Sequence, residues 1–266
     1  MNTDRTSEGR LVEANLEAFL LALGRAGGGE ERLGPELCWT IGGSPIDYHN
    51  AVFGARLAAE DADAAIAQSL AVMRRRGVPG SWHLGPWSRP ADLGARLEAA
   101  GFAAGFAEIG MAADIRALPP GEPASGISVE EVFDEAGLTA WVETLARGFG
   151  EVLREAEWVG SCWRRLGYGP ATDWRHFIGR LDGQPAATAT LFLADGVAGL
   201  YFVFTAAEAR RRGLGAAVTR AALEEAARLG VTTAVLGASQ AGAALYRRLG
   251  FEDCCALPIY EWSPQA

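Results

Sequence analysis

The stretch that decides the fold runs from Ala198 to Ala217 and reads A-G-L-Y-F-V-F-T-A-A-E-A-R-R-R-G-L-G-A-A. Its apolar run, Leu200–Phe204, is too apolar for a strand with one exposed face, so we expect a central strand covered on both faces. Three arginines, Arg210–Arg212, then come directly before Gly213-Leu214-Gly215 at the start of a long helical pattern. Because unsatisfied N–H groups, the helix dipole and glycines without a Cβ atom favour anions, this turn predicts a diphosphate site.

The rest of the second half of the chain predicts a mixed α/β sheet. Asp182-Gly183 supplies the residues that a tight turn between two antiparallel strands requires. An antiparallel meander is therefore followed by a β-α-β unit, and this unit contains the stretch quoted above. Strands are expected at residues 127–133, 177–181, 186–193, 200–204, 233–236 and 251–262, and helices near 138–149, 155–166, 214–229 and 242–249.

A segment rich in proline and glycine, Ala117–Ala124, separates this half from the first. Segments of that composition commonly connect domains. We therefore predict a first domain over residues 1–118, a linker over 119–125 and a second domain over 126–266. In the first domain, helices are expected at residues 11–23, 61–76 and 90–100, and strands at 37–41, 51–57, 80–84 and 109–115.

The two halves share a short pattern. A helix end with Gly-Val, a strand, and a helix closed by Gly-Phe occur at residues 76–102 and again at 229–251. The pattern favours a duplicated fold, and chance similarity in a chain rich in alanine, arginine and leucine is the alternative. The first copy has no counterpart of Arg210–Gly215, so it would be a degenerate one.

Composition limits the function classes. The 266 residues are 49% hydrophobic and carry a net charge of −9, which argues against a nucleic-acid partner because binding to phosphates needs positive charge. No apolar leader precedes residue 10, and no run approaches 18 apolar residues, so we expect a soluble cytoplasmic protein without a membrane partner. The four cysteines form no C-x-x-C pair and are expected to be reduced thiols.

Two common phosphate-binding motifs do not fit the glycine turn. A P-loop requires a lysine directly after its last glycine, and neither Gly213 nor Gly215 is followed by one. A dinucleotide fingerprint requires a third Gly or Ala where Val218 stands, and an acidic residue at the end of the strand Thr233–Leu236. The turn therefore needs another explanation.

The pattern Arg210-x-x-Gly213-x-Gly215 after a buried strand, followed by Ala244-Leu-Tyr-Arg-Arg-Leu-Gly-Phe251, resembles the GNAT N-acetyltransferase superfamily. The resemblance covers about residues 127–262 and implies a GNAT-like acyl-CoA N-acyltransferase fold, in tandem with a degenerate N-terminal copy. It implies acetyl-CoA as the cosubstrate, with pantetheine along the strand and pyrophosphate at the turn. The residues implied to bind it are Phe202, Val203, Phe204, Thr205, Arg210, Arg211, Arg212, Gly213, Leu214, Gly215, Ala216, Ser239 and Tyr246.

Tyr246 and Ser239 each have two interpretations. By the resemblance, Tyr246 would hydrogen-bond or protonate the departing thiolate; otherwise it packs beside Leu245 and Leu249 on an amphipathic helix. Ser239 is either near the pantetheine or the N-cap of the following helix.

No motif in the sequence identifies the general base that would take the proton of the amine. Glu143 and Glu151 are the base candidates that we select, from helical segments that wall the acceptor site in this superfamily. Each is otherwise a solvated surface charge, and the tryptophans of the same region line the acceptor pocket or pack in the core. The wider set of candidates is Glu155, Glu157, Asp173 and His176, with the aromatic residues Trp158, Trp163 and Trp174. His49 and His83 lack metal-ligand spacing, so no metal is expected.

The sequence thus predicts an acetyl-CoA-dependent N-acetyltransferase. The acetyl group would pass to a primary amine of a small molecule or a peptide, by direct attack in a ternary complex. The alternative is a non-catalytic acyl-CoA sensor or scaffold with the same fold. A monomer or a homodimer is expected.

Overall fold

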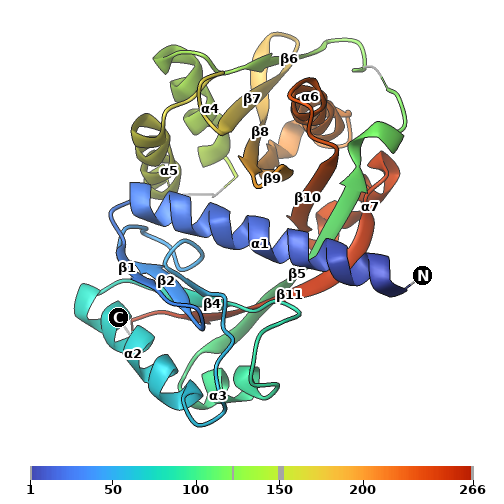
Figure 1. Ribbon diagram of the computed structural model, residues 1–266. Helices are drawn as coiled ribbons and strands as arrows, with labels where there is room; N and C mark the ends of the chain where they lie inside the picture. The colour runs from blue at the N-terminus through green and yellow to red at the C-terminus, as the bar shows by residue number, and fades with distance from the viewer. Residues whose placement is uncertain (1, 122, 149–152, 265–266) are drawn as a thin grey trace. The chain divides into compact units, whose positions relative to one another are not determined.

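The computed structural model describes residues 2–121, 123–148 and 153–264 (Figure 1). The chain divides into two compact units: unit 1 comprises Met1–Asn15 and Gly110–Cys254, and unit 2 comprises Leu16–Ile109 and Cys255–Ala266. The unit boundaries fall inside three long elements, which are α1 (Asn2–Ala26), β5 (Ala103–Asp114) and β11 (Glu252–Trp262). Each of these elements therefore contributes residues to both units.

Unit 1 contains a mixed sheet in the order β11-β5-β10-β9-β8-β7-β6. β6, β7, β8 and β9 pair antiparallel, whereas β9 and β10 pair parallel, as the meander and the β-α-β unit predicted. The strands are β6 (Ile127–Glu131), β7 (Trp174–Leu181), β8 (Gln184–Ala194), β9 (Val197–Thr205) and β10 (Thr233–Ala238). The helices are α4 (Glu135–Ala146), α5 (Leu153–Leu166), α6 (Leu214–Arg228) and α7 (Gln240–Leu249), with short 3-10 turns η1 (Ile115–Ala117) and η2 (Ala207–Ala209).

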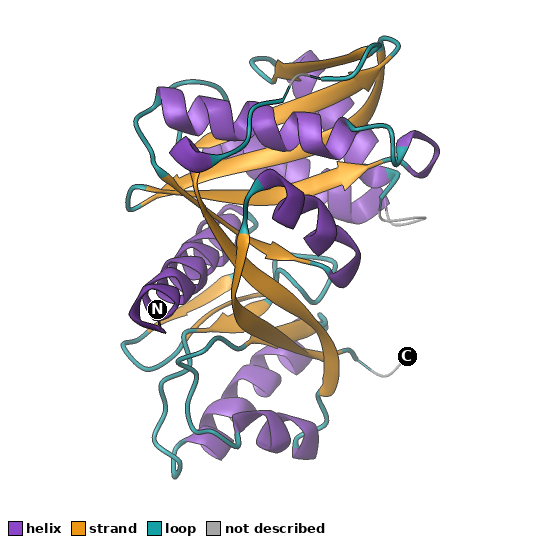
Figure 2. Ribbon diagram, turned by 90° about the vertical axis from the view of Figure 1, so that its right-hand side faces the viewer, coloured by secondary structure: helices purple, strands orange, loops and turns teal. Residues whose placement is uncertain are grey.

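Helices cover both faces of this sheet (Figure 2). α6 packs so closely on β7 that a Cβ atom at Gly179 would lie 2.7 Å from Val218. α4 and α5 cover the opposite face, where Trp141 and Trp163 contact the ring of His176. The double cover explains why the first half of β9, Val197–Leu200, is fully buried. Its second half, from Tyr201, is half-buried, which the apolar run did not predict.

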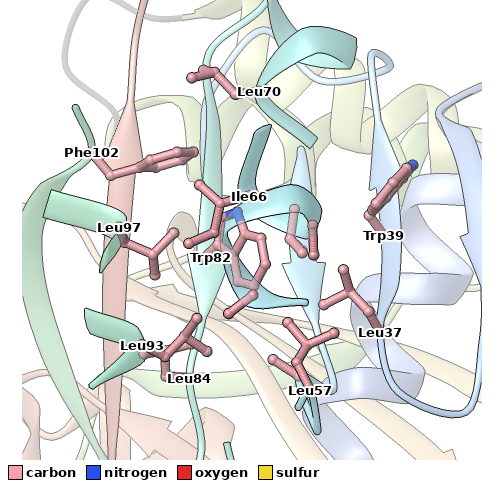
Figure 3. Close-up of a cluster of buried hydrophobic side chains, with 14 of the residues drawn as sticks. Leu37, Trp39, Leu57, Ile66, Leu70, Trp82, Leu84, Leu93, Leu97 and Phe102 are labelled. Atoms are coloured by element: carbon pink, nitrogen blue, oxygen red, sulfur yellow. The ribbon is translucent and has the colours of Figure 1, made fainter. Parts of the chain in front are cut away.

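Unit 2 contains the sheet order β1-β2-β3-β4-β11-β5. Its strands are β1 (Glu30–Leu33), β2 (Cys38–Ile41), β3 (Ala51–Phe53) and β4 (Gly80–His83), and its helices are α2 (Ala62–Arg76) and α3 (Leu93–Ala99). Trp82 lies within its core, beside aliphatic side chains of both helices such as Ile66 and Leu97 (Figure 3). These buried side chains are the periodic apolar positions of the sequence.

Several element bounds differ from the sequence prediction; β5, for example, begins at Ala103 and not at residue 109. The predicted strand 51–57 ends at Phe53, because Gly54 has a φ of 67° and turns the chain out of the strand. The charged strand Glu30–Leu33 was not predicted, since it lacks the apolar alternation that marks a strand. α1 begins at Asn2, well before the apolar repeat that starts at Leu11.

The order of elements from β3 to β5 matches that from β9 to β11. In each, two parallel strands are joined by a helix, namely β3–α2–β4 and β9–α6–β10. A second helix, α3 or α7, then ends in Gly-Phe and leads into the long strand β5 or β11. This shared topology is what a duplicated fold requires. The boundaries between the compact units lie within α1 and the long strands β5 and β11. The domain bounds 1–118 and 126–266 stay a prediction from the sequence.

Candidate functional site

β9 and β10 separate halfway along their length. Their parallel ladder joins Val197–Leu200 to Thr233–Leu236, and among the described residues it ends at that point. β9 continues to Thr205 beside β8 alone, since Ala187 pairs with Thr205 and Thr188 with Phe204. The edge of β9 from Val203 to Thr205 therefore extends beyond its ladder with β10.

A bulge in β9 accompanies this separation. Thr188 and Thr190 of β8 face Phe204 and Tyr201, so β9 holds one extra residue between them. Phe202 has a φ of 49°, an uncommon value for a bulky residue, and the Thr188 hydroxyl donates to its carbonyl at 2.8 Å. Bulges bend a strand and increase its twist, and they are common next to active sites. The bulge explains physically why β9 leaves β10.

The glycine turn follows directly after β9 and η2. Gly213 is the N-cap of the 15-residue helix α6 with a φ of 97°, and it offers no side chain to cap the first helical N–H groups. Arg211 also adopts a left-handed conformation, with a φ of 59°. Successive backbone N–H groups in such a turn form a concave site that favours anions, and the helix dipole adds to the effect.

The arginines of the turn have different surroundings. Nε of Arg210 donates to the Thr205 carbonyl at 3.2 Å, so this side chain closes the turn against the end of β9. Arg212 lies 3.7 Å from Asp182 in the β7–β8 hairpin, and both side chains are exposed. Arg211 is exposed as well. The diphosphate site predicted for this turn therefore depends on its backbone N–H groups, and no contact between residues that the structure describes fixes these arginine side chains around a common point.

α7 lies beside the start of α6. A Cβ atom at Gly215 would lie 3.2 Å from Leu245 of α7 and 3.4 Å from Thr205 of β9, so only a very small residue leaves this packing undisturbed. Tyr246, the next residue of α7, is 8% exposed and packs edge-to-face on Phe251 at 5.9 Å. The tyrosine interpreted as a thiolate partner is thus on the helix that contacts the start of α6 after the glycine turn.

Ser239 caps α7. Its hydroxyl accepts a hydrogen bond from the backbone N–H of Gly242 at 3.1 Å. The N-cap interpretation is correct, and a contact with pantetheine stays a prediction.

The base candidates lie in different surroundings. Glu143 is exposed on α4 and lines a pocket of 330 Å³ with Arg147 and Glu208, which form an ion pair with each other. Glu151 lies outside the described residues. Glu155 is buried, and Glu157 and Asp173 are exposed. Of the candidates that the structure describes, Glu143 lies on α4, Glu155 and Glu157 lie on α5, and Asp173 directly precedes β7.

His176, Trp163 and Trp174 form part of the core, and Trp158 is half-buried. Burial, and secondarily the charge of Arg175, lowers the pKa of His176 to about 3, so the imidazole is neutral near pH 7. Its Nδ1 lies 2.9 Å from the Thr190 hydroxyl, and its ring lies 4.5 Å from that of Trp163. Trp174 stacks on Phe192 at 4.1 Å. Trp163 and Trp174 therefore pack in the core, and Trp163 also contacts Phe202 in the bulge at 5.8 Å.

Two further properties concern the described part of the chain as a whole. Within residues 2–121, 123–148 and 153–264, no group of three His, Cys, Asp or Glu side chains has the arrangement of a metal site. None of the helices described is both long and apolar enough to span a membrane.

Comparison with protein families identifies one segment. Residues 138–251, from α4 to the start of β11, match the model of the family described as "Acetyltransferase (GNAT) family". No curated protein sequence matches the chain.

Solved structures with the same fold cover nearly the whole chain. A GCN5-related N-acetyltransferase from Kribbella flavida has 21% identity and a TM-score of 0.70, with 97% of this chain and 96% of that chain covered. One from Sphaerobacter thermophilus has 17% identity and a TM-score of 0.62, covering 88% of this chain and 83% of that chain. A tandem GNAT protein from the clavulanic acid biosynthesis pathway has 16% identity and a TM-score of 0.57, with 86% and 79% covered. At these identities the similarity establishes the fold, which is a mixed α/β GNAT-like fold.

Proposed function

Because residues 138–251 form a domain of the GNAT acetyltransferase family, we propose that this protein transfers an acetyl group from acetyl-CoA to a primary amine. The acceptor is a small molecule or a peptide, and it attacks directly in a ternary complex. One observation carries the proposal: the bulged edge of β9 runs beyond β10 and leads into a helix whose N-cap has no side chain. Such an edge and such a helix start suit an extended arm that ends in a diphosphate.

The geometry supports a specific mode of acyl-CoA binding. The amide groups of pantetheine would pair with the β9 edge from Val203 to Thr205, as an added strand does. The pyrophosphate would accept hydrogen bonds from the backbone of the turn Arg210–Ala216. Charge-assisted hydrogen bonds contribute roughly 1.5–3 kcal/mol each, so three or four of them anchor the cosubstrate. At Gly213 and Gly215 no side chain stands between the backbone and the pyrophosphate, since glycine lacks one.

The reaction needs a neutral amine and a leaving thiolate. The amine nitrogen forms a bond to the thioester carbonyl carbon, the carbon–sulfur bond breaks, and the sulfur leaves as the CoA thiolate. An ordinary tyrosine has a pKa near 10 and an ordinary thiol a pKa of about 8.5. Proton transfer from the phenol to the thiolate therefore costs roughly 2 kcal/mol. We therefore assign Tyr246 a hydrogen bond to the thiolate rather than full proton transfer. Glu143 and Glu151 remain the predicted candidates for receiving the amine proton.

Two measurements test the proposal. Acetyl-CoA is expected to raise the thermal stability of the protein, and CoA release is expected with at least one amine from a panel of amino acids, polyamines, amino sugars and peptides. Tyr246→Phe should lower kcat while leaving the affinity for acetyl-CoA nearly unchanged, because the ring still packs on Phe251. A protein that acetyl-CoA neither binds nor stabilises would exclude the proposed function.

The second candidate is an acyl-CoA sensor or scaffold. The packing of the Tyr246 ring on Phe251 supports it, since this contact is a role of Tyr246 that involves no turnover. A sensor binds acetyl-CoA, turns over no amine of the panel and is indifferent to Tyr246→Phe. The cytoplasmic location and the monomer or homodimer stay predictions from the sequence.

A further inference from the structure

A hydrogen-bonded pair stands where β9 leaves β10. Tyr201 is the first residue of β9 beyond the ladder with β10, and its hydroxyl donates to Oδ1 of Asn15 in α1 at 2.7 Å. Nδ2 of Asn15 donates in turn to the Val197 carbonyl at 3.4 Å. Asn15 is 3% exposed and Tyr201 is half-buried. All three residues belong to unit 1. Both ends of the Asn15 amide are thus engaged, which holds its oxygen toward Tyr201.

Gly199 makes room for this pair. A Cβ atom at residue 199 would lie 1.9 Å from Oδ1 of Asn15 and 2.6 Å from the ring of Tyr201. Any side chain there would displace the amide or the phenol. Glycine is normally unfavourable inside a strand, and it often marks a place where another group approaches the backbone closely. Here that group is the side chain of Asn15.

The strand register places Tyr201 on one particular face of the sheet. Tyr201 faces Thr190, which in turn faces His176 of β7. The His176 ring contacts Trp163 of α5, so Tyr201 lies on the α4 and α5 face. α6, whose first turn we assign to the pyrophosphate, packs on the other face. An amine that approaches a thioester on the β9 edge from the α4 and α5 face therefore meets the Tyr201 side chain.

The hydrogen-bond chemistry then restricts what Tyr201 can recognise. A phenol carries one proton, and Tyr201 gives that proton to Asn15. Any further hydrogen bond at its oxygen must be one that the oxygen accepts. Primary amines, whether neutral or protonated, offer N–H donors. A phenol whose proton is engaged in this way orients an amine and does not remove its proton.

We propose that Oη of Tyr201 accepts a hydrogen bond from the amine of the acyl acceptor and that Asn15 sets the direction of that bond. This inference rests on the proposed function and identifies part of its acceptor site. Tyr201 would be a binding residue for the amine, and Asn15 and Gly199 would be positioning residues. The N-terminal helix α1 thereby contributes to the acceptor site of unit 1.

The test compares Tyr201→Phe with the wild-type protein in a thiol-release assay. The amines are spermidine, glucosamine, lysine and the tripeptide Ala-Gly-Gly, and the comparison uses the one that the wild type acetylates fastest. Tyr201→Phe should lower kcat/KM for that amine about tenfold, mainly through KM, because it loses one hydrogen bond to a charged or strongly polar group. The Kd for acetyl-CoA should stay unchanged. Tyr168→Phe is the matched control, since its hydroxyl donates to Glu135 on the surface of the same unit.

A second variant distinguishes positioning from packing. Asn15→Ala should lower kcat/KM by a similar factor, and the double variant should lose little more, because the two residues act as one unit. Equal kcat/KM values for Tyr201→Phe and the wild type would overturn the inference and leave the proposed function intact. A wild-type protein that does not bind acetyl-CoA, or that releases no CoA with any of the four amines, would overturn both.

Discussion

Gly213→Ala tests whether the backbone of the glycine turn binds the pyrophosphate. Gly213 has a φ of 97°, and a Cβ atom there would meet only Ile127, at an ordinary contact distance of 3.7 Å. The substitution therefore adds no clash. Its cost comes from placing an alanine in a left-handed conformation, which is about 1–2 kcal/mol. For a domain of this size, such a cost lowers Tm by roughly 2–8 °C.

Gly230→Ala is the matched control at the other end of α6. Gly230 has a φ of 83°, and nothing lies within 4 Å of a Cβ atom built there. Its loss of stability should therefore be similar to that of Gly213→Ala. Gly230 follows the last turn of the helix, where carbonyl groups rather than N–H groups are exposed. The two variants thus share the strain but differ in their distance from the assigned anion site.

Acetyl-CoA affinity is the quantity that separates them. In Gly213→Ala, relief of the strain rotates the peptide groups that should donate to the pyrophosphate. Loss of one charge-assisted hydrogen bond corresponds to an affinity about tenfold lower. Isothermal titration calorimetry should show this loss for Gly213→Ala and a wild-type Kd for Gly230→Ala. Equal Kd values for both variants, with equal losses in Tm, would refute the assignment of the turn.

Three other outcomes follow from buried groups and helix ends. Arg175→Met should destabilise unit 1 by about 3–5 kcal/mol in urea unfolding, because it removes a buried guanidinium that lies 3.5 Å from Glu131 and 3.6 Å from Glu225, whereas the exposed Arg228→Met should cost less than about 1 kcal/mol. Ser239→Ala should cost about 1 kcal/mol by the same assay, because α7 loses its N-cap; an unchanged Kd for acetyl-CoA would contradict the predicted pantetheine contact. The pKa of His176 is lowered to about 3 in the folded protein, so the unfolded state binds the extra proton as pH falls below about 6.5, and this residue should make Tm fall between pH 6.5 and 3. A variant His176→Phe should show a shallower fall over that range.

Local patterns predicted most of unit 1. The apolar run before the arginines, the Asp182-Gly183 turn and the helix after Gly215 all appear as β9, a hairpin and α6. The match of residues 138–251 confirms the family resemblance. These features depend on residues a few positions apart, whose conformational preferences act over the same short range.

Other features needed contacts between distant residues. The bulge at Phe202 depends on the register of β8 against β9, and the end of the ladder at Leu200 depends on β10, some 30 positions along the chain. The run Leu200–Phe204 is continuously apolar and shows no alternation of apolar and polar residues. One extra residue in such a strand therefore leaves no sign in the sequence. For this reason the sequence predicted a strand covered along its whole length, although its second half is only half-buried.

By itself, then, the sequence determined that a strand, a glycine turn and a helix follow one another here, and which family this order belongs to. The tertiary structure alone decided that the strand separates from β10 just before the turn, and that Asn15 lies beside Tyr201, 186 positions away. The physical reason is the range of the forces involved. Glycine conformation, helix capping and apolar spacing act locally, whereas strand register and the close approach of α1 to Gly199 arise only once the whole sheet has packed.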